Sequence, residues 1–421
     1  MEGGRGDDHD LQRKQPFDSS PLADLGERRA VFSVLDSYRQ YRRQTHYNNT
    51  HRRRQNFYAL PQAHQSLLND PAISFLDNLS TIDDAIDENA DIADAILELA
   101  LGTFGLPDKV EKGSLIDWRD TARPLDLNKA HSTIKQFWRD WSKEGFEAEV
   151  RPMLDLILRD LASNLVRPAD QTKVLLPGAG LGRLLFELCL AGYLVEGNEI
   201  SYHQLLASNF ILNTTQRAHQ YRLYPFVGSF NNHISRQNQL QSVTIPDVHP
   251  GSAIEERMRS QQQVGGMNMS AGDFITSYSS SDQAGSFDAV VTMYFIDTAP
   301  NVIRYMQTIQ HCLADDGIWI NIGPLLWHFE DRVVDKHDVE KEDDYKVDAE
   351  GLSTEKEGIG EPGSFELTDE EVLVLAERMG FELISHESLP RAVGGYIQDP
   401  TSMLQNRYQC SHSVFRRTKA Q

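Results

Sequence analysis

The stretch VLLPGAGLGR, residues 174–183, decides the fold. It opens with three large aliphatic residues, which is typical of a short strand buried on both faces. Three glycines follow at alternate positions, and residues 184–191 then continue as an apolar helix that ends at Gly192. A strand, a glycine turn and a helix in this order predict the beginning of a parallel α/β sheet.

Further strands and helices continue this pattern towards the C-terminus. We expect additional buried strands at residues 193–199, 287–295 and 317–322. A helix at residues 302–313 separates the last two, as in a strand, helix, strand unit. Thr368 and Glu371 form a capping box that begins a helix ending at Gly380, and residues 381–417 contain two runs suited to antiparallel edge strands. The predicted fold class is α/β, with a Rossmann-like sheet.

The chain divides by composition into a tail, a helical region and the sheet domain. Residues 1–24 are polar and are expected to be disordered. Residues 25–167 show helical periodicity, and residues 168–417 contain the sheet. Two polar stretches, about 233–268 and 330–363, read as surface insertions, the second with 13 acidic against 5 basic residues.

Length and charge exclude several classes of protein. The 421 residues include 41 basic and 62 acidic side chains, a formal charge of −21, so neither nucleic acid nor anionic lipid is an expected partner. No apolar run reaches the roughly 18 residues of a membrane span, and no secretory signal is visible, so we expect a cytoplasmic or nuclear location. Three widely spaced cysteines predict neither disulfides nor a cysteine metal site, and no metal is expected.

Two charged runs in the helical region leave alternatives open. Residues 38–54 contain six arginines, no acid and interleaved tyrosines, a pattern that can bind nucleic acid but here favours the solvated face of a helix. Residues 82–100 carry apolar side chains at helical spacing, opposite a face of aspartates. This acidic face is interpreted as solvated, with a docking surface as the alternative.

The glycine turn is also the clearest candidate binding site. Gly178 and Gly180 allow close approach of a ligand to the backbone, and the next helix presents free N–H groups. A dinucleotide site requires Gly or Ala at position 183, where this chain has Arg183, so a nicotinamide cofactor is disfavoured. The turn suits S-adenosylmethionine instead.

Two acidic residues at predicted strand ends fit the same cofactor. Glu199 ends the second strand, where a carboxylate accepts hydrogen bonds from both ribose hydroxyls. Asp273 and Phe274 resemble the end of a third strand, where the acid would bond the adenine amino group and the ring would pack on the base. The second signal is less specific, because Asp-Phe is common in loops.

Taken together, six motifs make the chain resemble the carnosine N-methyltransferases. They are RRRQNFYALP (52–61), QFWRDWS (136–142), the glycine turn, GNEIS (197–201), YFIDTA (294–299) and GPLLWHF (323–329). The resemblance covers roughly residues 35–65 and 125–417 without the insertions. It implies an S-adenosylmethionine-dependent enzyme with a class I methyltransferase sheet, which methylates the imidazole ring of carnosine, to anserine, or of related histidine dipeptides.

The resemblance also implies roles for individual residues. Gln136 and Arg139 would reach the cofactor, Arg139 by pairing with its carboxylate, and it assigns Gly178, Glu199, Asp273 and Phe274 to the cofactor as well. The substrate pocket would consist of Asp297, His328, Tyr396 and Tyr408. As the catalytic residue, Asp297 would accept the imidazole N–H, select the tautomer and stabilise the forming imidazolium.

Other acceptors and a non-catalytic role remain as alternatives. RNA is disfavoured, because Asp297 is followed by Thr298 and Ala299 rather than by a D-P-P-Y-like tetrapeptide. A peptidyl histidine stays open as the acceptor. A scaffold of the same fold is disfavoured by the intact glycine turn, Glu199 and Asp297. A homodimer formed through the N-terminal helices also stays open.

Overall fold

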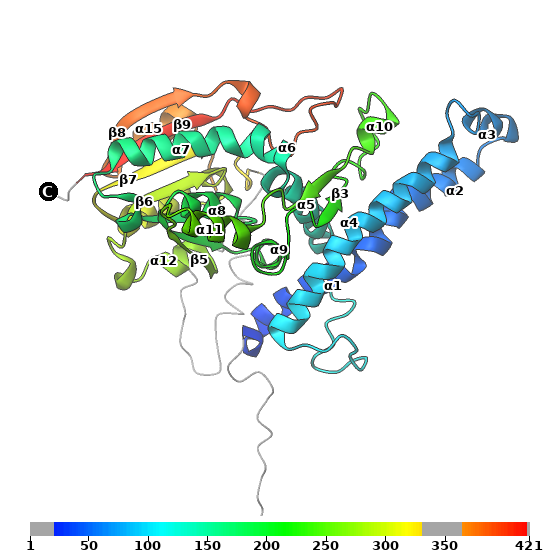
Figure 1. Ribbon diagram of the computed structural model, residues 1–421, viewed down its shortest axis with the longest axis horizontal. Coiled ribbons are helices and arrows are strands. Elements are labelled where there is room, and N and C mark those ends of the chain that lie inside the picture. The colour runs from blue at the N-terminus through cyan, green and yellow to red at the C-terminus, as the bar shows by residue number, and fades with distance from the viewer. Residues whose placement is uncertain (1–20, 331–363, 419–421) are drawn as a thin grey trace, which may run out of the picture.

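The computed structural model describes residues 21–330 and 364–418, which form a sheet domain and an extension of long helices (Figure 1). The extension consists of α1 (Leu25–His46), α2 (Arg52–Tyr58), α3 (Gln62–Leu68), α4 (Phe75–Phe104) and α5 (Pro124–Trp141). α1 and α4 lie side by side and carry α2 and α3 at the end remote from the sheet. Within the described ranges, no helix has the length and hydropathy that crossing a membrane requires.

The central sheet has seven strands in the order β5-β2-β1-β6-β7-β9-β8. Their bounds are β1 Lys173–Pro177, β2 Leu194–Glu199, β5 Gly266–Ala271, β6 Phe287–Met293, β7 Leu313–Gly323, β8 Phe381–Ser388 and β9 Ser411–Arg417. The strands from β5 to β7 are parallel, whereas β9 pairs antiparallel with both β7 and β8. The α/β fold and the C-terminal antiparallel strands are confirmed. The strand order reverses between β1 and β6, and ligands of open α/β sheets bind at the carboxyl edge beside such a reversal.

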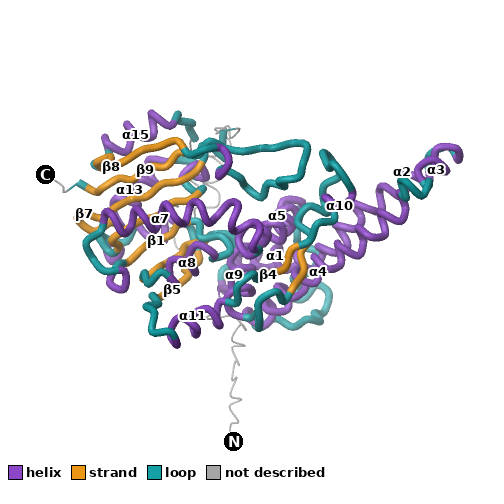
Figure 2. The backbone as a smooth tube through the Cα atoms, turned by 45° about the horizontal axis from the view of Figure 1, so that its top comes forward, coloured by secondary structure: helices purple, strands orange, loops and turns teal. Residues whose placement is uncertain are grey.

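Helices cover both faces of this sheet (Figure 2). α7 (Arg151–Asn164) and α8 (Arg183–Leu190) pack on one face, and α13 (Val302–Cys312) and α15 (Asp369–Arg378) pack on the other. Along β1, Val174 and Leu176 join the first cluster while Leu175 joins the second. Because successive strand side chains point to opposite faces, a strand covered on both sides is apolar throughout.

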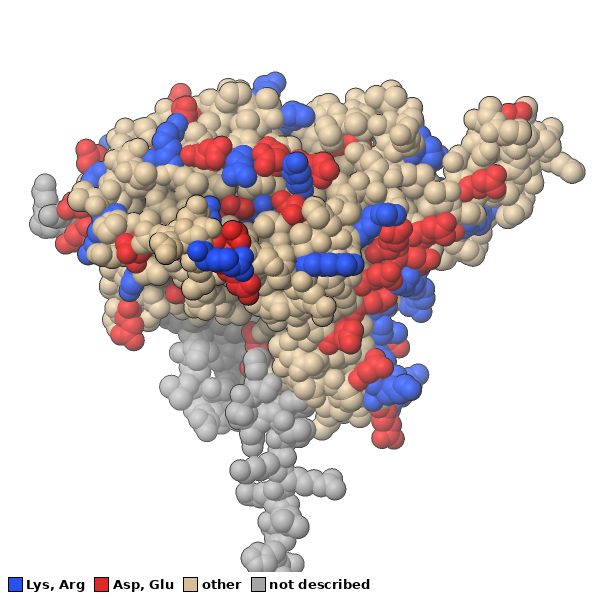
Figure 3. All heavy atoms as spheres, viewed as in Figure 1, with Lys and Arg blue, Asp and Glu red and all other residues tan. Residues whose placement is uncertain are grey.

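The two charged runs of the extension neutralise each other. The guanidinium of Arg42 on α1 lies 2.6 Å from Asp87, 2.7 Å from Asp91 and 2.8 Å from Asp94 on α4. Figure 3 shows acidic side chains gathered along α4 with basic side chains beside them. These side chains remain largely exposed to solvent, as the sequence predicted, and packing of α1 against α4 also brings the opposite charges into contact.

The predicted N-terminal boundary differs from the observed one. Leu22 is fully buried in the core of the helical extension. Asp24 is the N-cap of α1, and its carboxylate accepts a hydrogen bond from the Glu27 N–H at 2.8 Å. The ordered region therefore begins before residue 25, and residues 1–20 of the predicted tail lie outside the described residues.

The first predicted insertion, residues 233–268, has regular structure. It contains α10 (Arg236–Gln239), β4 (Val243–Ile245) and α11 (Pro250–Arg259), and β4 pairs with β3 (Tyr221–Leu223). Its last residues belong to β5, the parallel edge strand, so the predicted end at residue 268 falls inside the sheet. The sequence did not reveal these elements because residues 233–268 contain few apolar side chains. In the case of β5 the reason is its position at the edge of the sheet, where a strand needs little burial. Residues 331–363 of the second insertion lie outside the described residues.

Candidate active site

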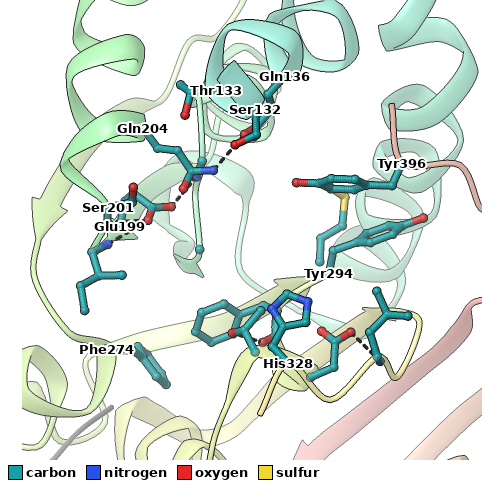
Figure 4. Close-up of a pocket in the computed structure, with 18 of the residues that line it drawn as sticks. Ser132, Thr133, Gln136, Glu199, Ser201, Gln204, Phe274, Tyr294, His328 and Tyr396 are labelled. Atoms are coloured by element: carbon teal, nitrogen blue, oxygen red, sulfur yellow. Dashed lines mark hydrogen bonds between the residues drawn. The ribbon is translucent and has the colours of Figure 1, made fainter. Parts of the chain in front are cut away.

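A cavity of about 420 Å³ lies at the carboxyl edge of the sheet, beside the reversal in strand order. All predicted site residues except Asp273 line it: Gln136, Arg139, Gly178, Gly180, Glu199, Phe274, Asp297, His328, Tyr396 and Tyr408. Figure 4 shows Glu199 and Gln204 on one side, with Tyr294 and Tyr396 opposite them. The cavity therefore brings the predicted cofactor and substrate groups into one space.

The glycine turn forms one wall and requires glycine at two points. Gly178 and Gly180 have φ angles of +68° and +56°, in the left-handed region that L side chains avoid. A Cβ atom at Gly178 would lie 2.6 Å from the ring of Phe295. The backbone of the turn is thus exposed to the cavity because no side chain can stand in between.

Glu199 is a buried carboxylate held by backbone donors. It accepts hydrogen bonds from the N–H groups of Gly180 at 3.0 Å, Ile200 at 3.0 Å and Ser201 at 2.9 Å. Burial raises the pKa of the Glu199 carboxyl, and these N–H groups oppose that rise. Its orientation at the end of β2 suits acceptance of hydrogen bonds from ligand hydroxyls.

Arg139 is a buried cation whose hydrogen-bonding capacity is only partly used. Its side chain is 6% exposed, with Nη1 3.7 Å from Asp140 and Nε 3.9 Å from Glu149. Nε and Nη2 have no hydrogen-bond partner among the residues that the structure describes. Burial lowers the pKa of the guanidinium, but the neighbouring acids outweigh burial and raise it. A charged, unsatisfied guanidinium at a cavity wall fits an anionic ligand group such as the carboxylate of S-adenosylmethionine.

Asp297 and His328 lie next to each other at the far end of the cavity. Asp297 is 3% exposed, and its carboxylate accepts a hydrogen bond from the Leu326 N–H at 2.9 Å. The backbone carbonyl of Asp297 accepts a second hydrogen bond from the His328 N–H at 3.0 Å. Burial raises the pKa of the Asp297 carboxyl, although the Leu326 hydrogen bond acts in the opposite direction. The pair comes together because β6 and β7 are parallel neighbours whose carboxyl ends meet.

Three tyrosines complete the wall between Asp297 and Arg139. The rings of Tyr294 and Tyr396 lie 5.8 Å apart, and the Arg139 guanidinium is 5.2 Å and 5.1 Å from their centroids. Tyr408 is tied to the same loop, because its N–H donates to the Gly394 carbonyl at 2.8 Å. Tyr294 was not among the predicted site residues, although its place directly after a buried strand gives the same signal as Asp297.

Asp273 does not line the cavity, in contrast to the prediction for this residue. It is the N-cap of α12 (Phe274–Tyr278), and its carboxylate accepts the Thr276 N–H at 2.9 Å. Burial, with the negative charges of Asp273 and Glu199, raises the pKa of Tyr305, which does line the cavity. Asp273 therefore lies close to Tyr305 but is not part of the cavity wall that Phe274 and Tyr305 help to form.

Two further polar residues organise the site and have no signal in the sequence. The side-chain amide of Gln204 on α9 (Tyr202–Asn213) donates a hydrogen bond to the Glu199 carboxylate at 3.0 Å, and its oxygen lies 2.9 Å from the Gln136 side chain. Glu149 accepts hydrogen bonds from the backbone of the loop that carries Tyr396. Their partners are distant in the chain, so periodicity and spacing could not reveal them.

Arg183, which made the turn unlike a dinucleotide fingerprint, is buried and structural. Its guanidinium lies 2.8 Å from Glu187 and 2.6 Å from Asp247, and it donates to the Asp140 carbonyl at 3.0 Å. It thus joins the start of α8 to α5 and to the strand and helix of residues 243–259. This arrangement holds the glycine turn against the helical extension.

The chain is similar to known proteins over nearly its whole length. Residues 116–419 match the family described as carnosine N-methyltransferase. The carnosine N-methyltransferase of Schizosaccharomyces pombe is 34% identical over 94% of this chain and 98% of its own. The carnosine N-methyltransferase of Mus musculus is 32% identical over 93% of this chain and 86% of its own.

Among solved structures, this chain is similar to the magnesium protoporphyrin IX methyltransferase of Synechocystis, which was solved with bound S-adenosylhomocysteine. The TM-score is 0.32 and the sequence identity is 12%, and the match covers 68% of this chain and 100% of the Synechocystis chain. The parallel sheet, the glycine turn and the family match agree with the Rossmann-like methyltransferase fold expected from the sequence. The chain is an enzyme that belongs to the carnosine N-methyltransferase family.

Proposed function

We propose that the protein transfers the methyl group of S-adenosylmethionine to an imidazole nitrogen of carnosine, giving anserine, or of a related histidine-containing dipeptide. The observation that carries this proposal is that one cavity contains both the glycine turn with Glu199 and the buried Asp297. A donor and an acceptor held in one cavity can be aligned for direct transfer, and positioning of this kind supplies much of the rate.

The residues around the turn have the chemistry that the cofactor needs. The free Nε and Nη2 of Arg139 suit its carboxylate, Glu199 suits the ribose hydroxyls, and Phe274 offers a ring for the adenine. When bound, S-adenosylmethionine supplies an electrophilic methyl group on a sulfonium. The protein then has to orient the acceptor and exclude water, and it needs no strong base.

Asp297 is the residue that would activate the acceptor. A carboxylate that accepts the N–H of a neutral imidazole selects one tautomer and leaves the lone pair on the other nitrogen free. As methylation makes the ring cationic, the same carboxylate stabilises the developing charge, and its burial strengthens this interaction. His328 and the tyrosines wall the space and would contact the rest of the dipeptide.

Mass spectrometry of candidate acceptors tests this proposal. Carnosine, histidine-containing peptides and total RNA are incubated with S-adenosylmethionine and either the wild type or Asp297→Ala. We expect carnosine to gain one methyl group with the wild type and to gain it far more slowly with the variant. NMR of the product then identifies the methylated nitrogen.

Binding measurements separate the possible negative results. S-Adenosylhomocysteine should raise the Tm of both proteins, because it contacts the turn rather than Asp297. Unaltered transfer by the variant would remove Asp297 from the mechanism. Transfer only to peptides or RNA would replace carnosine as the acceptor, and a protein without ligand-induced stabilisation would be a scaffold.

A further inference from the structure

A second cavity of about 410 Å³ adjoins the active-site cavity. Tyr396 and Tyr408 line both, so the two spaces share a wall at the acceptor end. The second cavity is also lined by Lys135, His233 and Asp399. A molecule whose imidazole lies beside Asp297 would reach these charged groups by passing the side chains of Tyr396 and Tyr408, which is the path that the inference below requires.

Asp399 presents an unused carboxylate oxygen to this second cavity. Its side chain is 8% exposed. Oδ1 accepts hydrogen bonds from the Thr401 N–H at 2.8 Å and from the Gln241 amide at 3.1 Å. Oδ2 has no hydrogen-bond partner within the described part of the chain. A buried carboxylate oxygen without a donor costs free energy, which a ligand that donates hydrogen bonds would recover.

His233 presents a second unused acceptor beside it. The ring Nε2 lies 2.9 Å from the Ser229 carbonyl, which can only accept, so the proton resides on Nε2. In the neutral ring, Nδ1 then carries a lone pair, and it too lacks a hydrogen-bond partner among residues 21–330 and 364–418. Nδ1 and the Asp399 Oδ2 are 3.9 Å apart, too far for a hydrogen bond between them. Two such acceptors fit one group that bears several hydrogens and a positive charge.

We propose that Asp399 and His233 bind the terminal ammonium group of the acceptor dipeptide. This inference rests on the proposed function, because it places the imidazole of the same molecule beside Asp297. Lys135 lines the same cavity, with its ammonium 5.4 Å from the centre of the Phe226 ring and within the electrostatic influence of Glu149 and Asp399. It makes no ion pair at hydrogen-bonding distance with a described residue, so it can bind the carboxylate of the dipeptide. The charges of the second cavity thus complement a zwitterion.

The two acceptors are held in place by the surrounding loops. His233 forms an isolated bridge with Ser402, and the Met403 N–H donates to the Asn232 carbonyl at 2.8 Å. On the other side, Glu149 binds the backbone N–H of Gln398 at 2.8 Å. A fixed pair of acceptors loses little freedom on binding and can discriminate between ligands.

Steady-state kinetics with carnosine and propionyl-histidine test the inference. Propionyl-histidine lacks only the amino group of carnosine, so the two acceptors differ at the proposed contact alone. We expect the KM of the wild type to be about tenfold higher for propionyl-histidine than for carnosine. A hydrogen bond to a charged group typically strengthens binding by about tenfold or more. Asp399→Asn should raise the KM of carnosine about tenfold and leave that of propionyl-histidine within about twofold.

Control variants keep this test independent of folding. Asp170→Asn makes the same chemical change at an exposed residue and should leave both KM values unchanged. His233→Ala removes the second acceptor and should raise the KM of carnosine selectively, about threefold. S-Adenosylhomocysteine should bind the wild type and all three variants with the same Kd.

The possible outcomes distinguish the inference from the proposed function. Equal KM values for the two acceptors in the wild type would overturn the ammonium site and indicate a bound water between Asp399 and His233. An equal loss for both acceptors in Asp399→Asn would show a purely structural role and overturn it as well. If the wild type methylates neither acceptor, the proposed function fails, and the ammonium site fails with it.

Discussion

The Glu149 carboxylate accepts the backbone N–H of Ile397 at 2.7 Å, which joins the segment before α7 to the loop that carries Tyr396. The same carboxylate accepts the Gln398 N–H at 2.8 Å and lies 3.9 Å from the guanidinium of Arg139. No side chain fits at Gly395, where a Cβ atom would lie 2.5 Å from the Glu149 Oε1. One buried acid thus positions both the cofactor-side arginine and an acceptor-side tyrosine.

Replacement of Glu149 by Gln should loosen this loop. The amide can accept only one of the two backbone hydrogen bonds, so we expect the free energy of unfolding to fall by about 1–3 kcal/mol. The KM of the acceptor should rise more than kcat falls, because Tyr396 loses its support. Urea denaturation and steady-state kinetics measure the two effects. Glu147→Gln, at an exposed position in the same segment, should change neither, and an equal effect of both substitutions would contradict this role.

Replacement of Arg139 by Lys should weaken cofactor binding selectively. Lysine keeps the charge but loses the planar set of donors that fits a carboxylate. We expect the Kd of S-adenosylhomocysteine, measured by calorimetry, to rise about tenfold. Methylthioadenosine lacks the amino-acid carboxylate and should bind the wild type and the variant equally. A similar loss for both ligands would show that Arg139 supports the cavity without contacting the carboxylate.

Protonation of His412 should make stability depend on pH. Its ring, on β9, lies 2.7 Å from Asp160 of α7 and 3.0 Å from Glu387 of β8. Burial lowers the pKa of His412, but these carboxylates outweigh burial and raise it above its ordinary value. A raised folded-state pKa contributes stability that is fully present below the unfolded pKa of about 6.5 and is lost as pH rises through the folded pKa.

Urea denaturation of the wild type and His412→Asn at several pH values tests this dependence. The difference in the free energy of unfolding should be largest near pH 6 and should shrink as the pH is raised. His64→Asn, at an exposed position on α3, should show no such trend. A difference that stays constant across the range would mean that the ring contributes by packing and not by its charge.

The ion pairs between α1 and α4 should contribute modestly and in a salt-dependent way. Arg42 contacts three aspartates, but its side chain is 36% exposed and solvent screens the attraction. We expect Arg42→Gln to reduce the free energy of unfolding by about 0.5–1 kcal/mol at low salt and by less at about 1 M salt. Arg43→Gln, the neighbouring exposed arginine, serves as the control. A loss that is independent of salt would indicate packing of the Arg42 side chain as the cause.

Much of the fold was predictable because its signals are local. The continuous apolar runs of β1 and β6 and the glycines of the turn identified the sheet and its order of elements. Weakly apolar strands were missed, as in the case of β5, which the composition of residues 233–268 assigned to an insertion. Periodicity reports burial, so it identifies central strands more readily than edge strands.

The sequence by itself determined the parallel sheet, the glycine turn, and the strand-end positions of Glu199 and Asp297. It could do so because parallel strands bring their carboxyl ends to one edge, which places residues that follow them in one site. Only the tertiary structure decided the contacts of Glu149 with Ile397, of Arg42 with Asp87 and of His233 with Asp399. The partners in each pair are far apart in the chain, and helix and loop packing, which local spacing does not encode, brings them together.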